Sequence, residues 1–246
     1  MHLQTKIAPY WKRRLAVQSS PRPIISFTFD DFPRSAVSAG GKILSQFGIR
    51  GTYYASMGLA GTQTAVGEIF HASDIDQLMA DGHELGCHTL NHTRSCDTTA
   101  AGLLVSCADN REKIAQLCGG LKPSSFSFPE GVVTLGGKAA LGATYSSCRS
   151  IEPGLNDDPV DMAFLRANRL YSRWGTSELK KAIARNKELR AWLIVYTHDV
   201  TEQPSLYGCT PAEFGEIVQC ALESGADVLP VREAHMRFSP VSSKAA

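Results

Sequence analysis

Residues 24–33 read IISFTFDDFP, an apolar, β-branched and aromatic run that ends in two adjacent carboxylates. The run has the composition of a buried strand. Neighbouring ionised side chains repel each other, and core packing gives no reason to place Asp30 beside Asp31. We therefore expect either a solvated turn or a site at the strand end that uses both carboxylates.

Further runs outside this stretch predict a repeated strand–helix pattern. Strands are expected at 51–57, 83–88, 125–128, 143–147, 163–167, 191–197 and 226–231. Stretches with helical spacing lie at 35–47, 73–81, 97–118, 134–141, 176–189 and 211–224. This alternation indicates an α/β protein with a parallel sheet and outer helices, either closed into a barrel or open and doubly wound.

Length and charge restrict the class of protein. The chain has 246 residues and a formal net charge of +1, so we expect one domain with no excess charge to attract nucleic acid. Its catalytic core is expected at about 22–238, with an N-terminal extension over 1–21 and a frayed tail over 239–246. The segment 150–162 is expected to be a long loop.

The amino terminus carries cations with no apolar stretch after them, and no run is long enough to span a bilayer. We therefore expect a cytoplasmic protein with no membrane span. The seven cysteines are an odd number in no zinc-ribbon spacing, which favours free thiols over a disulfide framework.

Titratable residues collect where the predicted strands end. Asp30 and Asp31 follow the first strand, His88 ends HELGCH, Pro129 and Glu130 follow SFSF, and His198 follows WLIVYT. In α/β folds the carboxyl ends of the strands form the edge that carries the active site. We expect these side chains to meet at that edge.

The segment HTLNH places His88 and His92 four residues apart. On a helical turn this spacing puts both imidazoles on one face, within reach of one ion. A carboxylate from another strand would complete a three-ligand site with open positions, as a catalytic metal requires.

Three segments in this order carry a resemblance to a known family: SFTFDD at 26–31, GHELGCHTLNH at 82–92 and WLIVYTHDV at 192–200. Together they resemble the polysaccharide deacetylase family, the NodB homology domain of carbohydrate esterase family 4. The resemblance covers roughly residues 22 to 235 and implies a distorted (β/α) barrel.

The resemblance also implies roles for residues of this chain. Asp30 would be the catalytic base and Asp31 a metal ligand, together with His88 and His92. His198 matches the late histidine that acts as general acid. The segment SFSFPEG at 125–131 aligns with the third motif, in which Pro129 and the backbone of Glu130 would help to hold the oxyanion.

The chain departs from the family pattern at four positions. Phe32 stands where glycine is common after the aspartate pair, and Ser127 where the third motif has an arginine that orients the catalytic aspartate. Glu130 replaces an aromatic residue, and Tyr196 a leucine. We hypothesise that Arg149 or Arg166 replaces the missing arginine and pairs with Asp30 or the substrate.

The sequence thus predicts a metal-dependent hydrolase that removes acetyl from the nitrogen of a sugar, acting on a carbohydrate or small acetylated substrate. Two imidazoles and one carboxylate favour Zn²⁺, and Co²⁺, Ni²⁺ or Mn²⁺ also fit. Two alternatives stay open: a related C–N hydrolase acting on a small non-sugar amide, and a non-catalytic carbohydrate-binding relative. The sequence leaves N- versus O-deacetylation and the oligomeric state open.

Overall fold

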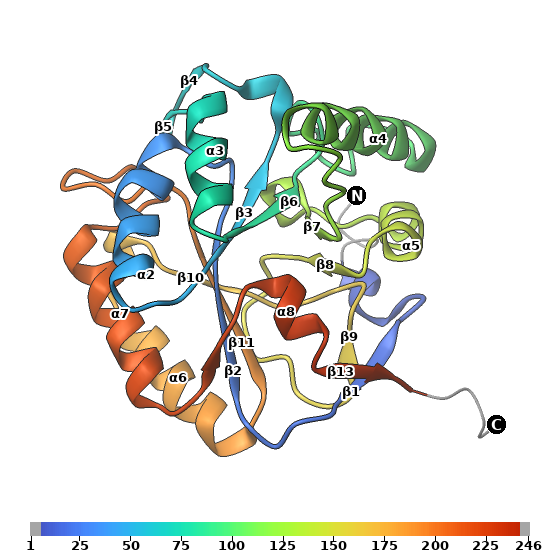
Figure 1. Cartoon of the computed structure of the whole chain (residues 1–246). Coiled ribbons are helices and arrows are strands. Elements are labelled where there is room, and N and C mark those ends of the chain that lie inside the picture. Colours follow the sequence, from blue (N-terminus) through green and yellow to red (C-terminus); the bar gives the residue numbers. More distant parts are fainter. Residues whose placement is uncertain (1–5, 242–246) are drawn as a thin grey trace.

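The computed structural model describes residues 6–241, and its centre is a curled, mainly parallel sheet (Figure 1). The strand order along the sheet is β10-β11-β2-β3-β6-β7-β8, and β12 pairs with β2. The strands are β2 (Ile24–Phe29), β3 (Thr52–Ala55), β6 (Glu84–Cys87), β7 (Ser125–Ser127), β8 (Ser147–Arg149), β10 (Asn168–Arg169), β11 (Trp192–Thr197) and β12 (Asp227–Val228).

Helices cover the outer face of this sheet (Figure 1). They are α2 (Lys42–Gln46), which continues a π-helical turn over Ala36–Gly41, α3 (Ala72–Ala80), α4 (Ala100–Leu117), α5 (Leu135–Thr144), α6 (Ser177–Leu189) and α7 (Pro211–Glu223). The short helix α8 (Val231–His235) packs instead with Ile24 and Trp192 on the inner side. All six predicted helices are present. No helix within residues 6–241 is long and apolar enough to cross a membrane.

Both faces of β2 are buried, which explains why the strand reads as a continuous apolar run. Ile25, Phe27 and Phe29 pack into the layer between sheet and helices. The alternate residues point into the barrel, where Thr28 donates a hydrogen bond to the carbonyl of Val195 at 2.9 Å. By the same alternation the next residue, Asp30, faces the barrel interior.

A short irregular segment closes the barrel between β8 and β11. Leu165 forms a parallel bridge with Arg149, and β10 pairs with residues 195–196 of β11. The predicted strand at 163–167 is therefore wrong, because only residues 168–169 form a strand. The predicted strand at 143–147 is also wrong, because α5 extends to Thr144 and β8 begins at Ser147.

The terminal segments are more ordered than the sequence indicates. β1 (Leu15–Gln18) pairs antiparallel with β13 (Phe238–Pro240) and with β9 (Val160–Asp161). The expected extension at 1–21 and the expected tail at 239–246 thus each contribute residues to a small sheet, and 150–162 includes a strand as well as a loop. The rest of the tail, 242–246, lies outside the described residues.

All seven cysteines are free thiols, as predicted, and four of them are buried. At the amino ends of the strands, Glu84 accepts hydrogen bonds from Thr52, Ser125 and the backbone N–H of Arg232. This end of the sheet is held by a structural polar network, opposite to the edge that carries the predicted site.

Lys138 of α5 joins the amino-terminal segment to the barrel. Its buried ammonium group donates to the carbonyls of Ala8 and Pro9, at 2.8 and 3.2 Å, and pairs with Asp161 of β9 at 2.6 Å. Three separate segments therefore depend on one charge that has no access to water.

We predict that Lys138→Met lowers the free energy of unfolding by about 3–5 kcal/mol, because it leaves Asp161 as a buried carboxylate without its partner. Urea denaturation monitored by circular dichroism measures the change. Lys180→Met is the matched control, since Lys180 forms a solvent-exposed pair with Glu216 and its removal should leave the transition in place. Equal losses in both variants would contradict the proposed anchoring.

Candidate metal and catalytic site

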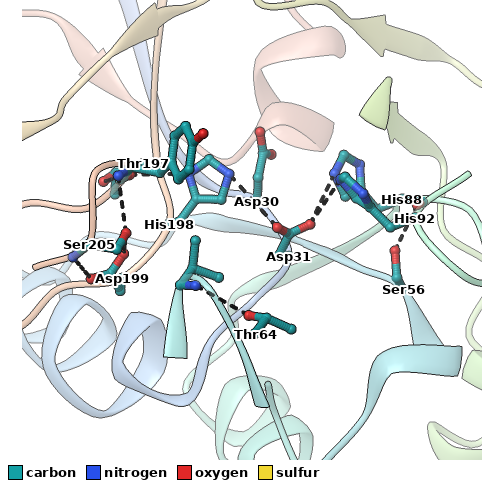
Figure 2. A network of polar contacts seen from close by, with 12 residues as sticks. Asp30, Asp31, Ser56, Thr64, His88, His92, Thr197, His198, Asp199 and Ser205 are labelled. Atoms are coloured by element: carbon teal, nitrogen blue, oxygen red, sulfur yellow. Dashed lines mark hydrogen bonds and ion pairs between the residues drawn. The ribbon is translucent and has the colours of Figure 1, made fainter. Parts of the chain in front are cut away.

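The predicted site residues meet at the carboxyl edge of the sheet (Figure 2). Asp30 and Asp31 follow β2, His88 follows β6, and His198 follows β11. β2 is hydrogen-bonded to both β11 and β3, and β3 to β6, so the parallel register brings these strand ends together.

Asp31 lies at the centre of the group. Its Oδ1 atom is 3.5 Å from Nε2 of His88 and 3.2 Å from Nε2 of His92. Its Oδ2 atom is 4.0 Å from Nε2 of His198. One carboxylate thus faces all three predicted imidazoles, as Figure 2 shows.

The two histidines of HTLNH are brought together by a loop, and the prediction of a helical turn is wrong. Thr89 and His92 have left-handed backbones, with φ of 62° and 54°. The hydroxyl of Thr89 accepts a hydrogen bond from the Thr93 N–H at 2.8 Å, which closes the turn. Gly58 donates to the Leu90 carbonyl at 2.7 Å, and a side chain there would collide with this loop.

His88 is oriented by the third-motif segment. Its Nδ1 atom lies 2.8 Å from the carbonyl oxygen of Ser127, so Nδ1 carries the proton and donates it. Burial lowers the pKa of His88 to about 4, so the imidazole is neutral at pH 7. Nε2 therefore presents a lone pair toward Asp31, which is the state a metal-ligating histidine needs.

The three residues Asp31, His88 and His92 fit a divalent ion. Each offers one ligand atom, and these atoms all lie within 4.8 Å of one another. Ligand atoms around a tetrahedral zinc ion are roughly 3.3 Å apart, close to the separations found here. The buried Oδ1 atom of Asp31 has no hydrogen-bond partner among the described residues, and an ion would satisfy it.

Asp30 points away from this triad into the barrel and meets Arg149. The Arg149 guanidinium, which is fully buried, pairs with Oδ1 of Asp30 and also donates to the hydroxyl of Ser127. Burial alone would raise the pKa of Asp30, but Arg149 together with two nearby histidines outweighs burial and holds that pKa below its usual value. Asp30 is therefore ionised at neutral pH.

Arg149 takes the place of the missing third-motif arginine. Ser127 and Arg149 are direct partners in the register of β7 and β8, so their side chains leave the sheet on the same face. The guanidinium lies between the rings of Tyr54 and Tyr196, 5.2 and 5.1 Å from their centroids. These contacts hold the guanidinium of Arg149 against Asp30. The cation thus comes from β8, the strand next to the β7 position where the family has its arginine.

The other predicted arginine, Arg166, does not pair with Asp30. Arg166 donates to the carbonyl of Pro153 at 3.0 Å and holds the loop after β8. In the third motif, Pro129 is buried, whereas Glu130 is exposed and left-handed with φ of 52°. The Glu130 carboxylate pairs with the exposed Arg94 at 3.1 Å, so its side chain is directed to the protein surface.

Phe32 is a core residue and does not narrow the site. Its fully buried ring stacks on Phe70 at 4.8 Å and packs against Tyr53 at 5.1 Å. Both Asp31 and Phe32 have φ of 58°, so the chain turns sharply after β2. The departure from glycine at this position therefore affects the turn and the core below it.

His198 packs against two aromatic residues, Tyr171 and Tyr207, that were not predicted from the sequence. Its Nδ1 atom lies 3.2 Å from the carbonyl of Tyr207, and its ring centroid is 5.9 Å from Tyr171 and 5.7 Å from Tyr207. The Asp199 carboxylate accepts two hydrogen bonds from Ser205, which orders the following loop. No local pattern marks the two tyrosines, because they come from loops far apart in the chain.

Comparison with known proteins supports the fold and the family. The family model for polysaccharide deacetylase matches residues 18–140. A search of curated protein sequences gave no significant match.

Solved structures have the same architecture at low sequence identity. The chitin deacetylase of the fungal pathogen Colletotrichum lindemuthianum is 19% identical, with a TM-score of 0.61, over 88% of this chain and 89% of that one. A family 4 acetyl xylan esterase from Clostridium thermocellum, in complex with cobalt, is 16% identical, with a TM-score of 0.62, over 87% and 90%. A carbohydrate esterase domain of a xylanase from the Trinervitermes trinervoides hindgut metagenome is 15% identical, with a TM-score of 0.61, over 88% and 91%. At these identities the likeness shows the fold.

We predict that His92→Ala weakens Zn²⁺ binding at least about 100-fold, because it removes one of three ligands. Isothermal titration of metal-free protein with Zn²⁺ measures the affinity. His71→Ala is the control, since His71 is exposed and pairs with Glu68 away from the triad. Unchanged zinc affinity in His92→Ala would exclude the proposed ligand set.

Arg149→Met should lower the free energy of unfolding of metal-free protein at pH 7 by about 3–5 kcal/mol, because it strands a buried carboxylate. Without the guanidinium, burial raises the pKa of Asp30. A carboxyl with a raised pKa in the folded state destabilises the protein above its unfolded-state pKa, so the deficit should shrink as pH falls toward about 4. Urea denaturation at several pH values measures this dependence.

Arg166→Met serves as the control for this experiment, since it loses only a contact to a backbone carbonyl. A deficit in Arg149→Met that stays constant with pH would show that the loss comes from packing against Tyr54 and Tyr196 and not from the ion pair.

Proposed function

Because the chain belongs to the polysaccharide deacetylase family and shares its distorted (β/α) barrel, we propose that it is a metal-dependent hydrolase that removes an acetyl group from the nitrogen of a sugar. The observation that carries the proposal is that two adjacent carboxylates have different partners. Asp31 faces the Nε2 atoms of His88 and His92, whereas Asp30 faces the guanidinium of Arg149.

Asp31, His88 and His92 would hold the metal. A bound divalent ion would supply Lewis acidity and lower the pKa of a coordinated water molecule to about 7. Zinc is the first candidate because of the two imidazoles and one carboxylate, and cobalt, nickel and manganese also suit this donor set.

Asp30 would act as the general base. It is ionised because Arg149 outweighs the effect of burial on its pKa, and its position next to Asp31 places it beside the metal ligands. Arg149 and Ser127 restrict its rotamer, so one oxygen is engaged by the cation and the other is left for proton transfer.

His198 would act as the general acid on the opposite side of the scissile bond. An amine is a poor leaving group until it is protonated, and an imidazole near neutrality can provide that proton. The Tyr207 carbonyl engages Nδ1, so Nε2 points toward Asp31 and the reacting centre. The backbone at Pro129 and Glu130 would contribute to binding the oxyanion.

The nitrogen-linked acetyl group is the more specific part of the proposal. The structural relatives include both a chitin deacetylase and an acetyl xylan esterase, so an oxygen-linked acetyl group is the second candidate. The presence of a positioned acid, His198, favours the amide, because an alkoxide leaves more easily than an amine anion and needs less help.

We expect zinc-loaded protein to release acetate from N-acetylated mono- or disaccharides. In Asp30→Asn, the rate of release should fall at least about 100-fold with zinc content unchanged, because the base is lost and the ligands remain. Acetate is measured by a coupled enzymatic assay, and zinc by atomic absorption.

Asp157→Asn in the exposed loop after β8 is the control and should keep full activity. Release of acetate from O-acetylated sugars alone would assign the second candidate. No acetate release from any acetylated sugar by zinc-loaded protein would rule out the proposal.

A further inference from the structure

A group of arginine and aromatic side chains lies directly beside His198. We call it the arginine–aromatic rim and define it as Arg169, Tyr171, Arg173, Trp174 and Tyr207. The guanidinium carbon of Arg173 is 5.8 Å from the ring centroid of Tyr171 and 5.5 Å from that of Tyr207. Because these two rings pack against His198, a single aromatic ring separates Arg173 from the proposed general acid.

Trp174 joins the two arginines of the rim. The guanidinium carbon of Arg169 lies 4.3 Å from the Trp174 ring and that of Arg173 5.6 Å. The indole is 57% exposed, so this is an open surface and not part of the core. A cation–π contact of this kind does not use up the N–H donors of a guanidinium.

Neither Arg169 nor Arg173 is neutralised by the rest of the described chain. Within residues 6–241 their guanidinium groups form no ion pair with a carboxylate. Neighbouring cations on α6 behave differently: Lys181 pairs with Glu178 at 2.8 Å, and Arg185 with Glu188 at 2.7 Å. The rim therefore carries two uncompensated positive charges on a chain whose overall charge is nearly balanced.

A cavity of about 530 Å³ opens beside the rim, between α6 and the loop after β8. Arg169, Trp174 and Tyr196 contribute to its lining. The volume falls within the range of small-molecule sites. Tyr196 also lies against Arg149, which pairs with Asp30, so one tyrosine ring connects the cavity lining to the support of the proposed base.

We propose that the arginine–aromatic rim binds a phosphate group carried by the substrate, so that the enzyme acts on a phosphorylated N-acetylated sugar. This inference rests on the proposed function, because it places the sugar nitrogen at His198 and the phosphate on the far side of Tyr171 and Tyr207. Arg169 and Arg173 both lie against Trp174, and their N–H donors and positive charge match a phosphate ester, which accepts several hydrogen bonds and carries up to two charges. A carboxylate carries one negative charge and would neutralise only one of the two arginines.

Binding of the deacetylated product tests this inference without turnover. Isothermal titration of zinc-loaded protein should give at least tenfold tighter binding of glucosamine 6-phosphate than of glucosamine, since the 6-phosphate lies at the end of the sugar remote from the nitrogen. The double variant Arg169→Gln/Arg173→Gln should lose this difference, and each single variant should lose part of it. Arg185→Gln is the matched control, since Arg185 lines the same cavity but is paired with Glu188, and it should bind as the wild type does.

Three results would overturn the inference: equal affinity for glucosamine and its 6-phosphate, a phosphate preference that survives in the double variant, or glucuronate binding as tightly as glucosamine 6-phosphate through the same arginines. Circular dichroism of each variant verifies folding. Acetate release from N-acetylglucosamine and its 6-phosphate is measured separately. Absence of turnover of both sugars by the wild type would then count against the proposed function. Absence of an arginine-dependent preference for the phosphate would count only against the phosphate-binding role of the rim.

Discussion

The buried ion pair between Asp30 and Arg149 is the interaction on which the site depends. A carboxylate inside the barrel would otherwise take up a proton, because burial penalises its charged form. The guanidinium keeps it ionised, and the rings of Tyr54 and Tyr196 hold that guanidinium from two sides. A charged carboxylate in the barrel interior therefore requires contributions from β2, β3, β8 and β11 together.

Two adjacent carboxylates can serve different purposes because the chain turns between them. Strand alternation points Asp30 into the barrel, and continued strand geometry would point Asp31 into the helix layer beside Phe29. The left-handed backbone at Asp31 and Phe32 turns the carboxylate to the edge of the sheet instead. Such a backbone costs about 1–2 kcal/mol for each L-residue. Burial of Phe32 against Phe70 and Tyr53 contributes about 2–3 kcal/mol, so it offsets much of this strain.

The sequence predicted the part of the site that depends on strand ends. The alternation of strands and helices identified β2, β6 and β11 with their terminal residues, and parallel topology then required Asp30, Asp31, His88 and His198 to meet at one edge. It failed for the His88–His92 loop, because a spacing of four residues fits both a helical turn and a compact loop. Only tertiary contacts, from Gly58 and the Thr89 hydroxyl, distinguish the two. Tyr171 and Tyr207 were missed for a similar reason: their proximity to His198 comes from chain folding over long separations and leaves no local pattern.

In this chain Ser127 stands where the third motif usually has arginine, yet a guanidinium, that of Arg149, still lies beside Asp30. Positions 127 and 149 are paired across β7 and β8, and in a parallel sheet paired residues project from the same face at nearly the same height. A guanidinium from either position can reach the end of β2, provided that the other position is small enough to leave room. Serine meets this condition, and its hydroxyl also accepts from the displaced cation. The physical requirement is thus a cation beside Asp30, and strand register determines which positions in the chain can supply it.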